Sequence, residues 1–351
     1  MNWTNTNSST TTNSATTTTT LEWRVKLAVN IVISVVGFIG NLLVLLVLKR
    51  QKRKSIAPFE YFIGNLSIAD LIMVVAYMIQ EYFSIPGSTV YCKAFVPIIS
   101  VAFTASMYTV TAIAIFREKA ILNPLTFRPG RKAIYMTIAG IWIVGFVHIV
   151  PTYVAVDVMD GECALLWPSP MMAKVYIIAL FVGQYGIPLT TMTVCYTKIV
   201  LFLKRHKMPH CEMDTKNNLQ MTRKRKQDKE VMKISVIIVV LYSVLSLPLQ
   251  IFWLTLLVFG NPSMATIISL FADQLTLLHS CCNPLVYGSL SQKFRQRLVK
   301  FLRSISCPCP TQHRSHAIAS CHGDSAEMAS SSREQHTNMV IPTESTEKPE
   351  I

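Results

Sequence analysis

A carboxylate in the middle of an apolar stretch is the most chemically informative feature of this chain. Asp70 lies within Phe59–Phe83, a predominantly apolar stretch. A charged side chain at the centre of an apolar helix is costly in free energy, so we expect it to face other helices and to find a partner there. A structural hydrogen bond with Asn41 and an ion or proton site are both compatible with this position.

A second stretch, Cys92–Glu118, carries chemistry at both ends. It begins with the thiol of Cys92, has Ser106 near its middle and ends in the charged pair Arg117-Glu118. As a helix it would rise roughly 37 Å from Cys92 to Arg117, enough to cross the hydrocarbon core of a bilayer. This pattern is typical of a helix that connects the two sides of a membrane.

The whole chain contains seven apolar stretches of this kind. Such stretches are read as transmembrane helices, because a bilayer offers the backbone no water to bond. The chain is 51% hydrophobic and only 15% charged, whereas a soluble domain has about 25% charged residues. We predict an all-α integral membrane protein with a seven-helix transmembrane bundle at residues 26–290. The stretches are approximately Leu27–Leu48, Phe59–Phe83, Cys92–Ile115, Ala133–Val154, Met172–Leu203, Val231–Val258 and Met264–Leu290.

The distribution of basic residues predicts the orientation. Of the 33 Lys and Arg residues, five lie in Lys49–Lys54 and ten in Lys204–Lys233. Because positive loops stay in the cytoplasm, we expect an extracellular N-terminus and a cytoplasmic C-terminus in a multi-pass plasma-membrane protein. This bias also accounts for the net charge of +14, so a nucleic-acid partner is not expected.

The cysteines follow the same topology. Of the nine in the chain, only Cys92 and Cys163 fall on the outer, oxidising side, and they are predicted to form a disulfide. Cys307 and Cys309 follow residues 291–303, a basic amphipathic stretch expected to form a helix on the inner membrane surface. Both are candidates for palmitoylation, with free thiols as the alternative.

The two terminal segments have polar compositions. Residues 1–25 are rich in Thr, Ser and Asn and lack the apolar core of a signal peptide. We expect them to be disordered and extracellular, with candidate N-glycosylation at Asn2 and Asn7. Residues 304–351 are expected to form a disordered cytoplasmic tail.

Prolines interrupt the last three spans, at Pro188, Pro248 and Pro284. A proline kinks a helix and frees a carbonyl that neighbouring helices or water must satisfy. Kinks near a shared depth suit a bundle that changes shape.

Together these features resemble the rhodopsin-like (class A) G-protein-coupled receptors, over about residues 25–303. Each feature falls at the family's place in its own span, so the specificity lies in the set. The set comprises Gly40-Asn41, Leu66 through Asp70, Cys92, Arg117, Trp142, Cys163, Pro188, Tyr196, Pro248 and Asn283-Pro284-x-x-Tyr287.

The resemblance implies roles for several residues. It places the Cys92–Cys163 pair as the family disulfide and assigns Asp70, Ser106 and Asn283 to a sodium pocket, whose oxygen atoms are the ligands that a hard cation prefers. No cofactor is expected apart from this candidate allosteric Na⁺.

The resemblance also implies a switch at the inner end of the bundle. Arg117 would be held in the inactive form by an acid on span six, for which Asp228 is the candidate. Tyr196 and Tyr287 would support Arg117 in the active form.

The chain departs from the family pattern at three positions. Phe116 replaces the acid that usually precedes Arg117, which can raise basal activity or weaken G-protein coupling. Ser246 replaces the tryptophan that usually stands two residues before the proline of span six. His279 replaces a residue that is more often Asn, and we interpret it as a neutral, hydrogen-bonded interior histidine rather than a pH sensor.

Some ligand classes are disfavoured by the residues present. Span seven contains no lysine, so a retinal Schiff base cannot form there. Ile99 stands where amine receptors of this family carry an aspartate, which argues against a monoamine ligand.

Two outer carboxylates favour a basic ligand instead. Glu81 lies eleven residues after Asp70, and Asp273 lies eleven residues before Pro284, so we expect both at a similar depth. They would hold a guanidinium or ammonium group by charge-assisted hydrogen bonds; alternatively, both are ordinary residues near the lipid–water interface. Other positions that the resemblance places in a ligand pocket are Gln80, Phe103, Gln184, Gln250 and Trp253.

We therefore predict a receptor for a short basic neuropeptide, free or C-terminally amidated, that activates heterotrimeric G proteins and is regulated by arrestin and receptor kinases within a lipid membrane. A non-signalling or arrestin-biased scavenger and a receptor for a small non-peptide ligand are the alternatives. A transporter is disfavoured because no internal repeat is visible, and an enzyme because no nucleophile–base pair or phosphate-binding glycine loop is present.

Overall fold

The computed structural model describes residues 12–51, 58–82, 88–205 and 215–306. Within these ranges seven helical spans are long and apolar enough to cross a membrane, which confirms the predicted all-α, seven-span architecture. The fifth span is formed by α5, η2 and α6, and the sixth by α7 and η3. The elements are α1 (Thr12–Lys49), α2 (Pro58–Tyr82), α3 (Thr89–Leu122), α4 (Arg131–Ala155), β1 (Val156–Met159), β2 (Glu162–Leu165), α5 (Pro170–Leu180), the π-helical turn η2 (Phe181–Gly186), α6 (Ile187–Arg205), α7 (Thr215–Trp253), the π-helical turn η3 (Leu254–Val258), α8 (Pro262–Leu290) and α9 (Gln292–Ser306).

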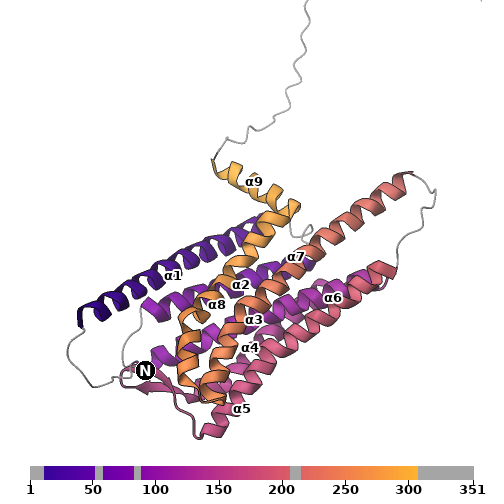
Figure 1. The fold of residues 1–351 in the computed structure, drawn as a ribbon. Coiled ribbons are helices and arrows are strands. Elements are labelled where there is room, and N and C mark those ends of the chain that lie inside the picture. The colour runs from indigo at the N-terminus through magenta and orange to yellow at the C-terminus, as the bar shows by residue number, and fades with distance from the viewer. Residues whose placement is uncertain (1–11, 52–57, 83–87, 206–214, 307–351) are drawn as a thin grey trace, which may run out of the picture. The chain divides into compact units, whose positions relative to one another are not determined.

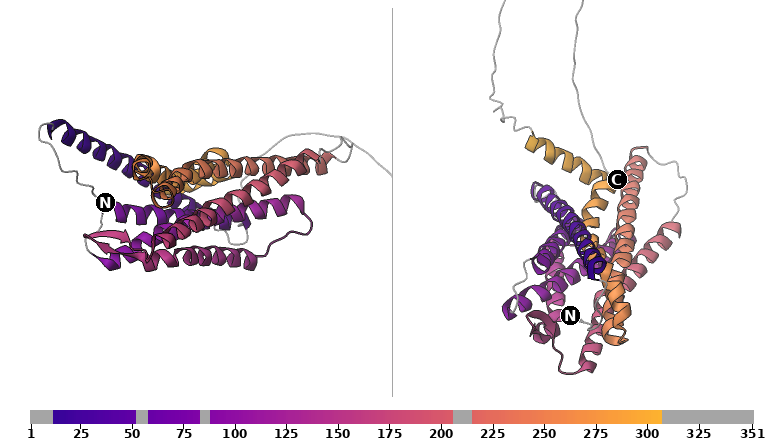
Figure 2. Two further views of the ribbon diagram at one scale, coloured as in Figure 1. Left: turned by 60° about the horizontal axis from the view of Figure 1, so that its bottom comes forward. Right: turned by 60° about the vertical axis from the view of Figure 1, so that its left-hand side comes forward.

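The third span, α3, forms the core of the bundle. The long helices run alongside one another (Figures 1 and 2), and α3 contacts α2, α4, α6 and α7. Its buried positions include Ala102, Ala105, Ala112 and Ala114. Without a hydrophobic driving force between helices in lipid, such small residues favour association by letting backbones approach closely.

A β-hairpin and α9 mark the two ends of the bundle. The strands β1 and β2 pair antiparallel and are joined by Asp160 and Gly161, both of which have positive φ angles (54° and 81°). Asp-Gly suits a two-residue hairpin turn of this type. Figure 1 shows the hairpin at one end of the bundle and α9 at the other, and we refer to these as the hairpin end and the α9 end.

The first helix begins earlier than predicted. Residues 1–25 were expected to be disordered, but α1 starts at Thr12 and continues without a break to Lys49. Residues 12–25 contain no Pro or Gly, and extending a helix that the apolar span has already nucleated costs little free energy. The candidate glycosylation sites Asn2 and Asn7 lie outside the described residues.

The helix after the last span agrees closely with the expected stretch. α9 ends at Ser306, three residues beyond the predicted boundary at 303. The candidate palmitoylation sites Cys307 and Cys309, and the rest of the predicted tail, lie outside the described residues.

Spans five and six each contain a proline and a π-helical turn. η2 ends at Gly186, two residues before Pro188, and η3 begins at Leu254, six residues after Pro248. π-Turns interrupt the regular backbone hydrogen bonding and are common at functional sites. Both turns belong to the spans for which the prolines predicted hinges.

The close approach of α3 and α4 depends on Gly145. A Cβ atom at this position would lie 3.2 Å from the backbone carbonyl oxygen of Val101. We expect Gly145→Leu to push the helices apart and to lower the melting temperature of the purified protein by about 2–10 °C. Gly140→Leu on the same helix is the control, because a Cβ there meets nothing within 4 Å. Equal melting temperatures for the two variants would contradict this account.

Candidate functional site

Three spans meet at the carboxylate of Asp70. The side chain is fully buried. Ser106 of α3 donates its hydroxyl to Asp70 Oδ1 at 3.0 Å, and Asn283 of α8 donates its amide to Asp70 Oδ2 at 2.7 Å. In the described part of the chain, the side chains that bond to this carboxylate are neutral. The structure thus brings together the three residues predicted to bind sodium.

The expected partnership between Asp70 and Asn41 is not what the structure shows. Asn41 donates its amide to the backbone carbonyls of Gly37 and Ser280, both at 3.0 Å. It therefore ties α1 to α8 rather than bonding to the carboxylate, because two carbonyls already satisfy its two donor hydrogens. Of the two possibilities considered for Asp70, the direct hydrogen bond with Asn41 is therefore not formed.

This cluster is suited to a small hard cation. A buried carboxylate bonded only to neutral side chains has no protein counter-charge, so its ionised form is costly in a medium of low dielectric constant unless a cation balances it. The hydroxyl of Ser106 and the amide oxygen of Asn283 are further oxygen atoms of the type that Na⁺ prefers. Asp70, Ser106 and Asn283 would hold the ion, whose chemistry is to balance that charge; sodium binding itself stays a prediction.

Arg117 lies beside a cavity at the α9 end. Its guanidinium carbon is 4.0 Å from the centroid of the Phe59 ring on α2, a cation–π contact. The cavity has a volume of about 480 Å³ and adjoins α1, α2, α3, α8 and α9. Tyr287, one of the predicted supports of Arg117, also lines it, while Tyr196 is buried in α6. The side chain of Asp228 lies outside the described residues, so its pairing with Arg117 stays a prediction.

Phe116 takes part in an aromatic cluster at the same end. Its ring packs edge-on against Phe62 of α2, with centroids 4.8 Å apart, and against Phe127 in the loop after α3, with centroids 5.6 Å apart. Where the family pattern has an acid, this chain therefore uses apolar packing to hold the end of α3.

Arginine contacts attach α9 to the first two spans. Arg297 of α9 pairs with Glu60 of α2, and Arg50, just after α1, lies over the ring of Phe301 with 4.6 Å between its guanidinium carbon and the ring centroid. These contacts were not predicted, because the partners are more than two hundred residues apart in the sequence and nothing local marks them.

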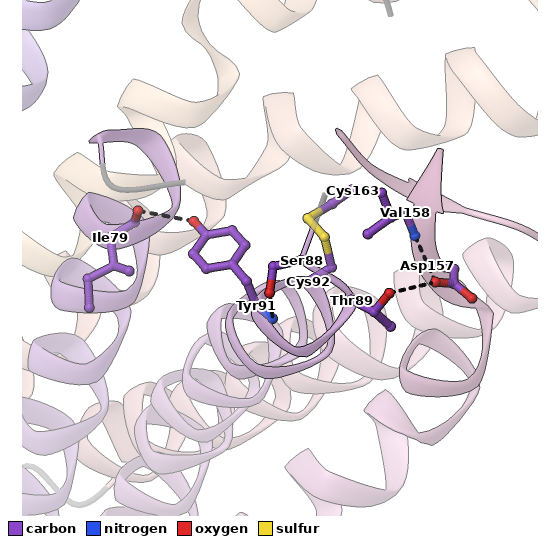
Figure 3. Close-up of a disulfide and its surroundings, with 8 residues drawn as sticks. All are labelled: Ile79, Ser88, Thr89, Tyr91, Cys92, Asp157, Val158 and Cys163. Carbon is purple, nitrogen blue, oxygen red and sulfur yellow. Dashed lines mark hydrogen bonds between the residues drawn. A yellow bond between two sulfur atoms is a disulfide. The ribbon is translucent and has the colours of Figure 1, made fainter. Parts of the chain in front are cut away.

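The predicted disulfide is present at the hairpin end. Cys92 at the start of α3 is bonded to Cys163 of β2, with their Cα atoms 5.4 Å apart. Figure 3 shows two further contacts of the same turn of α3. Thr89 donates to Asp157 of β1 at 3.3 Å, and Tyr91 donates to the Ile79 carbonyl at 3.0 Å. The hairpin is thus held to α3 by a covalent bond and a side-chain hydrogen bond.

The predicted ligand contacts differ in their surroundings. Gln184 is buried and donates its amide to Ser100 and Thr104 of α3 at 3.0 and 2.8 Å, so this amide already serves helix packing. Phe103 is also buried and packs against Tyr242, with centroids 6.3 Å apart.

The remaining predicted ligand contacts lie on α2, α7 and α8. Gln250 is buried, Trp253 and Asp273 are half-buried, and Gln80 is exposed near the end of α2. The side chain of Glu81 lies outside the described residues. The approach of Glu81 to Asp273 therefore stays a prediction.

His279 is an interior residue, as predicted, but it is not hydrogen-bonded. Its side chain is almost fully buried, and neither ring nitrogen has a hydrogen-bond partner among the described residues. The nearest aromatic ring, that of Tyr242, meets it edge-on with centroids 5.4 Å apart. The Tyr242 hydroxyl donates to the backbone carbonyl of Gln184 rather than to the imidazole.

The sodium hypothesis can be tested without a ligand. If Na⁺ binds at Asp70 only in the folded protein, Na⁺ must stabilise the folded state by mass action. We expect the melting temperature of the purified protein to rise when N-methylglucamine is replaced by Na⁺ at constant ionic strength, and Asp70→Asn to abolish the rise. Asp157→Asn, which removes a carboxylate on the hairpin, is the control and should keep it. A rise that persists in Asp70→Asn would exclude this site.

Comparison with known proteins places the chain in a family. The model of seven-transmembrane receptors of the rhodopsin family matches residues 40–287. The chain is 25% identical to neuropeptide Y receptor type 6 of Mus musculus over 324 residues, 84% of this chain and 85% of the relative. It is 27% identical to neuropeptide Y receptor type 4-2 of Homo sapiens over 322 residues, 81% of this chain and 80% of the relative. It is 30% identical to the neuromedin-K receptor of Oryctolagus cuniculus over 296 residues, 78% of this chain and 61% of the relative. The chain therefore belongs to the rhodopsin family of seven-transmembrane receptors.

Proposed function

We propose that this chain is a receptor for an extracellular peptide and that it couples to heterotrimeric G proteins. The observation that carries the proposal is the extent of the similarity. Receptors named for neuropeptide Y and neuromedin K match 84% and 78% of this chain, including the spans that would form a ligand pocket and a G-protein site.

The proposed orientation places the hairpin end outside the cell, at the plasma membrane. Disulfides form and persist in oxidising compartments, and the Cys92–Cys163 bond lies at this end. Basic residues gather towards the other end, including Lys204 and Arg205 at the end of α6 and the basic face of α9, which suits the cytoplasmic leaflet.

The proposed ligand is a short basic peptide, free or amidated. Asp157 and Asp160 on the hairpin would attract it electrostatically. Glu81 and Asp273 would then hold a guanidinium or ammonium group by charge-assisted hydrogen bonds. Trp253, half-buried at the last position of α7, would offer an aromatic surface to the ligand's apolar part.

The proposed mechanism is a shift between two arrangements of the bundle. A peptide changes their balance only by its differential affinity for them. In the favoured arrangement, the α9-end half of span six moves away from α3 and the cavity beside Arg117 widens to admit a helix of the G protein. The Arg117–Asp228 pair would oppose this movement, and Tyr196 and Tyr287 would support Arg117 after it.

Phe116 favours a second candidate function. Phe116 stands where the family pattern has an acid, so no carboxylate directly before Arg117 restrains it. Coupling to nucleotide exchange would then be weak. The chain would then be an arrestin-biased receptor. It would bind peptide and internalise it after receptor kinases phosphorylate the Ser/Thr-rich tail.

A peptide screen tests the ligand class. We expect a library of short basic peptides, amidated and free, to contain activators in cells that express the full chain, with calcium, cAMP and arrestin readouts. Glu81→Gln and Asp273→Asn should each lower the potency of an activator by about tenfold or more, because a charge-assisted hydrogen bond is lost. Asp160→Asn on the hairpin turn is the matched control. It removes only a long-range attraction that salt screens, so it should change potency less than threefold. Retained potency in both the Glu81→Gln and the Asp273→Asn variant would show that these two carboxylates do not hold the ligand.

The contact between Arg117 and Phe59 gives a test of coupling. If the Phe59 ring holds Arg117 in the arrangement seen, Phe59→Leu should raise basal nucleotide exchange per surface receptor by roughly two- to tenfold, as expected for a desolvated cation–π contact. Phe301→Leu removes the similar contact of Arg50 and should leave basal exchange unchanged. An equal response of both variants would show that Phe59 acts through general stability instead.

A further inference from the structure

Two tyrosines link spans five and six by a reciprocal pair of hydrogen bonds. Tyr242 of α7 donates its hydroxyl to the backbone carbonyl of Gln184 in η2 at 2.9 Å. Tyr185, the next residue of η2, donates its hydroxyl to the backbone carbonyl of Ser243, the next residue of α7, at 3.0 Å. The ring centroids of the two tyrosines are 5.8 Å apart. Each span thus supplies one donor and one acceptor, on consecutive residues, and we call this pair of bonds the tyrosine clasp.

Pro188 explains why the Gln184 carbonyl accepts a hydrogen bond from another span. In a regular α-helix this carbonyl would pair with the N–H of residue 188, and proline has none. The backbone forms η2 directly before the proline, where the N–H of Ile187 bonds to the carbonyl of Val182, five residues back. A bilayer core offers no water to such a carbonyl, so the Tyr242 hydroxyl supplies the donor that Pro188 cannot.

The clasp lies on the side of Pro248 that leads to the α9 end. Tyr242 and Ser243 precede Pro248 by six and five residues, and α7 runs from the α9 end towards the hairpin end. In the proposed opening, this half of span six pivots away from the bundle at the proline, and the Tyr242 hydroxyl and the Ser243 carbonyl would both leave η2. Because the two bonds join the same two segments, they must break together.

The tyrosine rings are held independently of their hydroxyls. Tyr242 is fully buried and its ring meets Phe103 and His279, while Tyr185 stacks on Phe181, with centroids 5.7 Å apart. A Tyr→Phe substitution therefore removes one hydrogen bond and leaves the ring packing in place. One turn beyond Tyr242 stands Ser246, so the clasp occupies a depth at which the tryptophan common in this family is missing.

We propose that Tyr185 and Tyr242 are positioning residues that hold span six against span five and thereby set the threshold for opening the α9 end. Loss of either hydroxyl shifts the balance towards the open arrangement in the absence of any ligand. The signalling consequence rests on the proposed coupling to G proteins, whereas the effect on the distance between the two spans does not.

Basal nucleotide exchange is the first measurement, made with the full chain in membranes and normalised to the number of surface receptors. We expect Tyr185→Phe and Tyr242→Phe each to raise it about three- to tenfold, the equilibrium effect of one net hydrogen bond. Tyr108→Phe is the matched control, because Tyr108 of α3 donates to the carbonyl of Gly183 in the same π-turn at 2.9 Å without contacting span six through that bond. Its basal exchange should stay at the level of the unmodified receptor. An equal rise in the control, or no rise in either clasp variant, would overturn the proposal.

The second measurement does not depend on a G protein. Spin labels on Lys204→Cys of α6 and Lys233→Cys of α7, both exposed positions, report the separation of the two spans near the α9 end. We expect the clasp variants to increase the population with a longer label-to-label distance, and Tyr108→Phe to leave the distribution unchanged. The labelled protein would carry serine at the half-buried Cys282 and at the four cysteines outside the described residues, namely Cys211, Cys307, Cys309 and Cys321.

The two measurements separate the clasp from the coupling. Suppose that the label-to-label distance is longer in the clasp variants, but neither they nor the unmodified receptor stimulate nucleotide exchange. This result would support the clasp and contradict the proposed G-protein coupling. An unchanged distance in both clasp variants would overturn the clasp, whatever the exchange assay gives.

Discussion

Polar groups inside a bilayer must find their hydrogen-bond partners in protein, and this constraint explains how the seven spans are held together. The carboxylate of Asp70 is the most costly of these groups, and its two oxygens are satisfied from α3 and α8. Trp142 of α4 bonds to Asn65 of α2, which in turn bonds to Thr109 of α3. Because each bond crosses between helices, the polar residues determine which helices are neighbours, while small residues on α3 let them approach. Membrane helices gain little from apolar burial against each other, so these few polar contacts account for much of the specificity of the bundle.

The same constraint connects the prolines to function. A proline inside a span leaves a carbonyl without its usual donor, and Pro188 leaves Gln184 in this position. The hydroxyl of Tyr242 satisfies that carbonyl from span six, so a local defect in one helix becomes a contact between two. A hinge that is also bonded to its neighbour can have two discrete arrangements, bonded and open, instead of bending continuously. Such two-state elements are what a receptor needs to convert a ligand's differential affinity into a change of shape.

The sequence predicted what depends on the bilayer and left out what depends on distant partners. The lengths of the apolar stretches predicted the seven spans, and the position of two cysteines on the oxidising side predicted the Cys92–Cys163 bond. Both are constraints that act on any chain in a membrane. The residues around Asp70 were predicted from family motifs, and the structure brings Ser106 and Asn283 to the carboxylate. The hairpin was not predicted, although Asp160-Gly161 is a recognised turn pattern. The contact of Arg117 with Phe59 could not be predicted, since the acid that usually precedes this arginine is absent and nothing near position 117 indicates a phenylalanine on another helix.

Aromatic packing lies at or next to each of the three departures from the family pattern. Phe116 contributes to an aromatic cluster, and Arg117 beside it lies over an aromatic ring. Ser246 stands where the family usually has a tryptophan on span six. The rings of Tyr242 and His279 meet one turn away from it. His279 and Asn283 are four residues apart on α8 and therefore lie on the same face of one helical turn. One contacts span six through Tyr242, and the other contacts Asp70 on span two. The turn between them lacks one regular backbone hydrogen bond, because Pro284 has no N–H for the carbonyl of Ser280. That carbonyl accepts from Asn41 of α1 instead. The turn of α8 that adjoins both the clasp and the buried carboxylate is thus tied to α1 by a side chain, so a polar residue again completes what a proline interrupts.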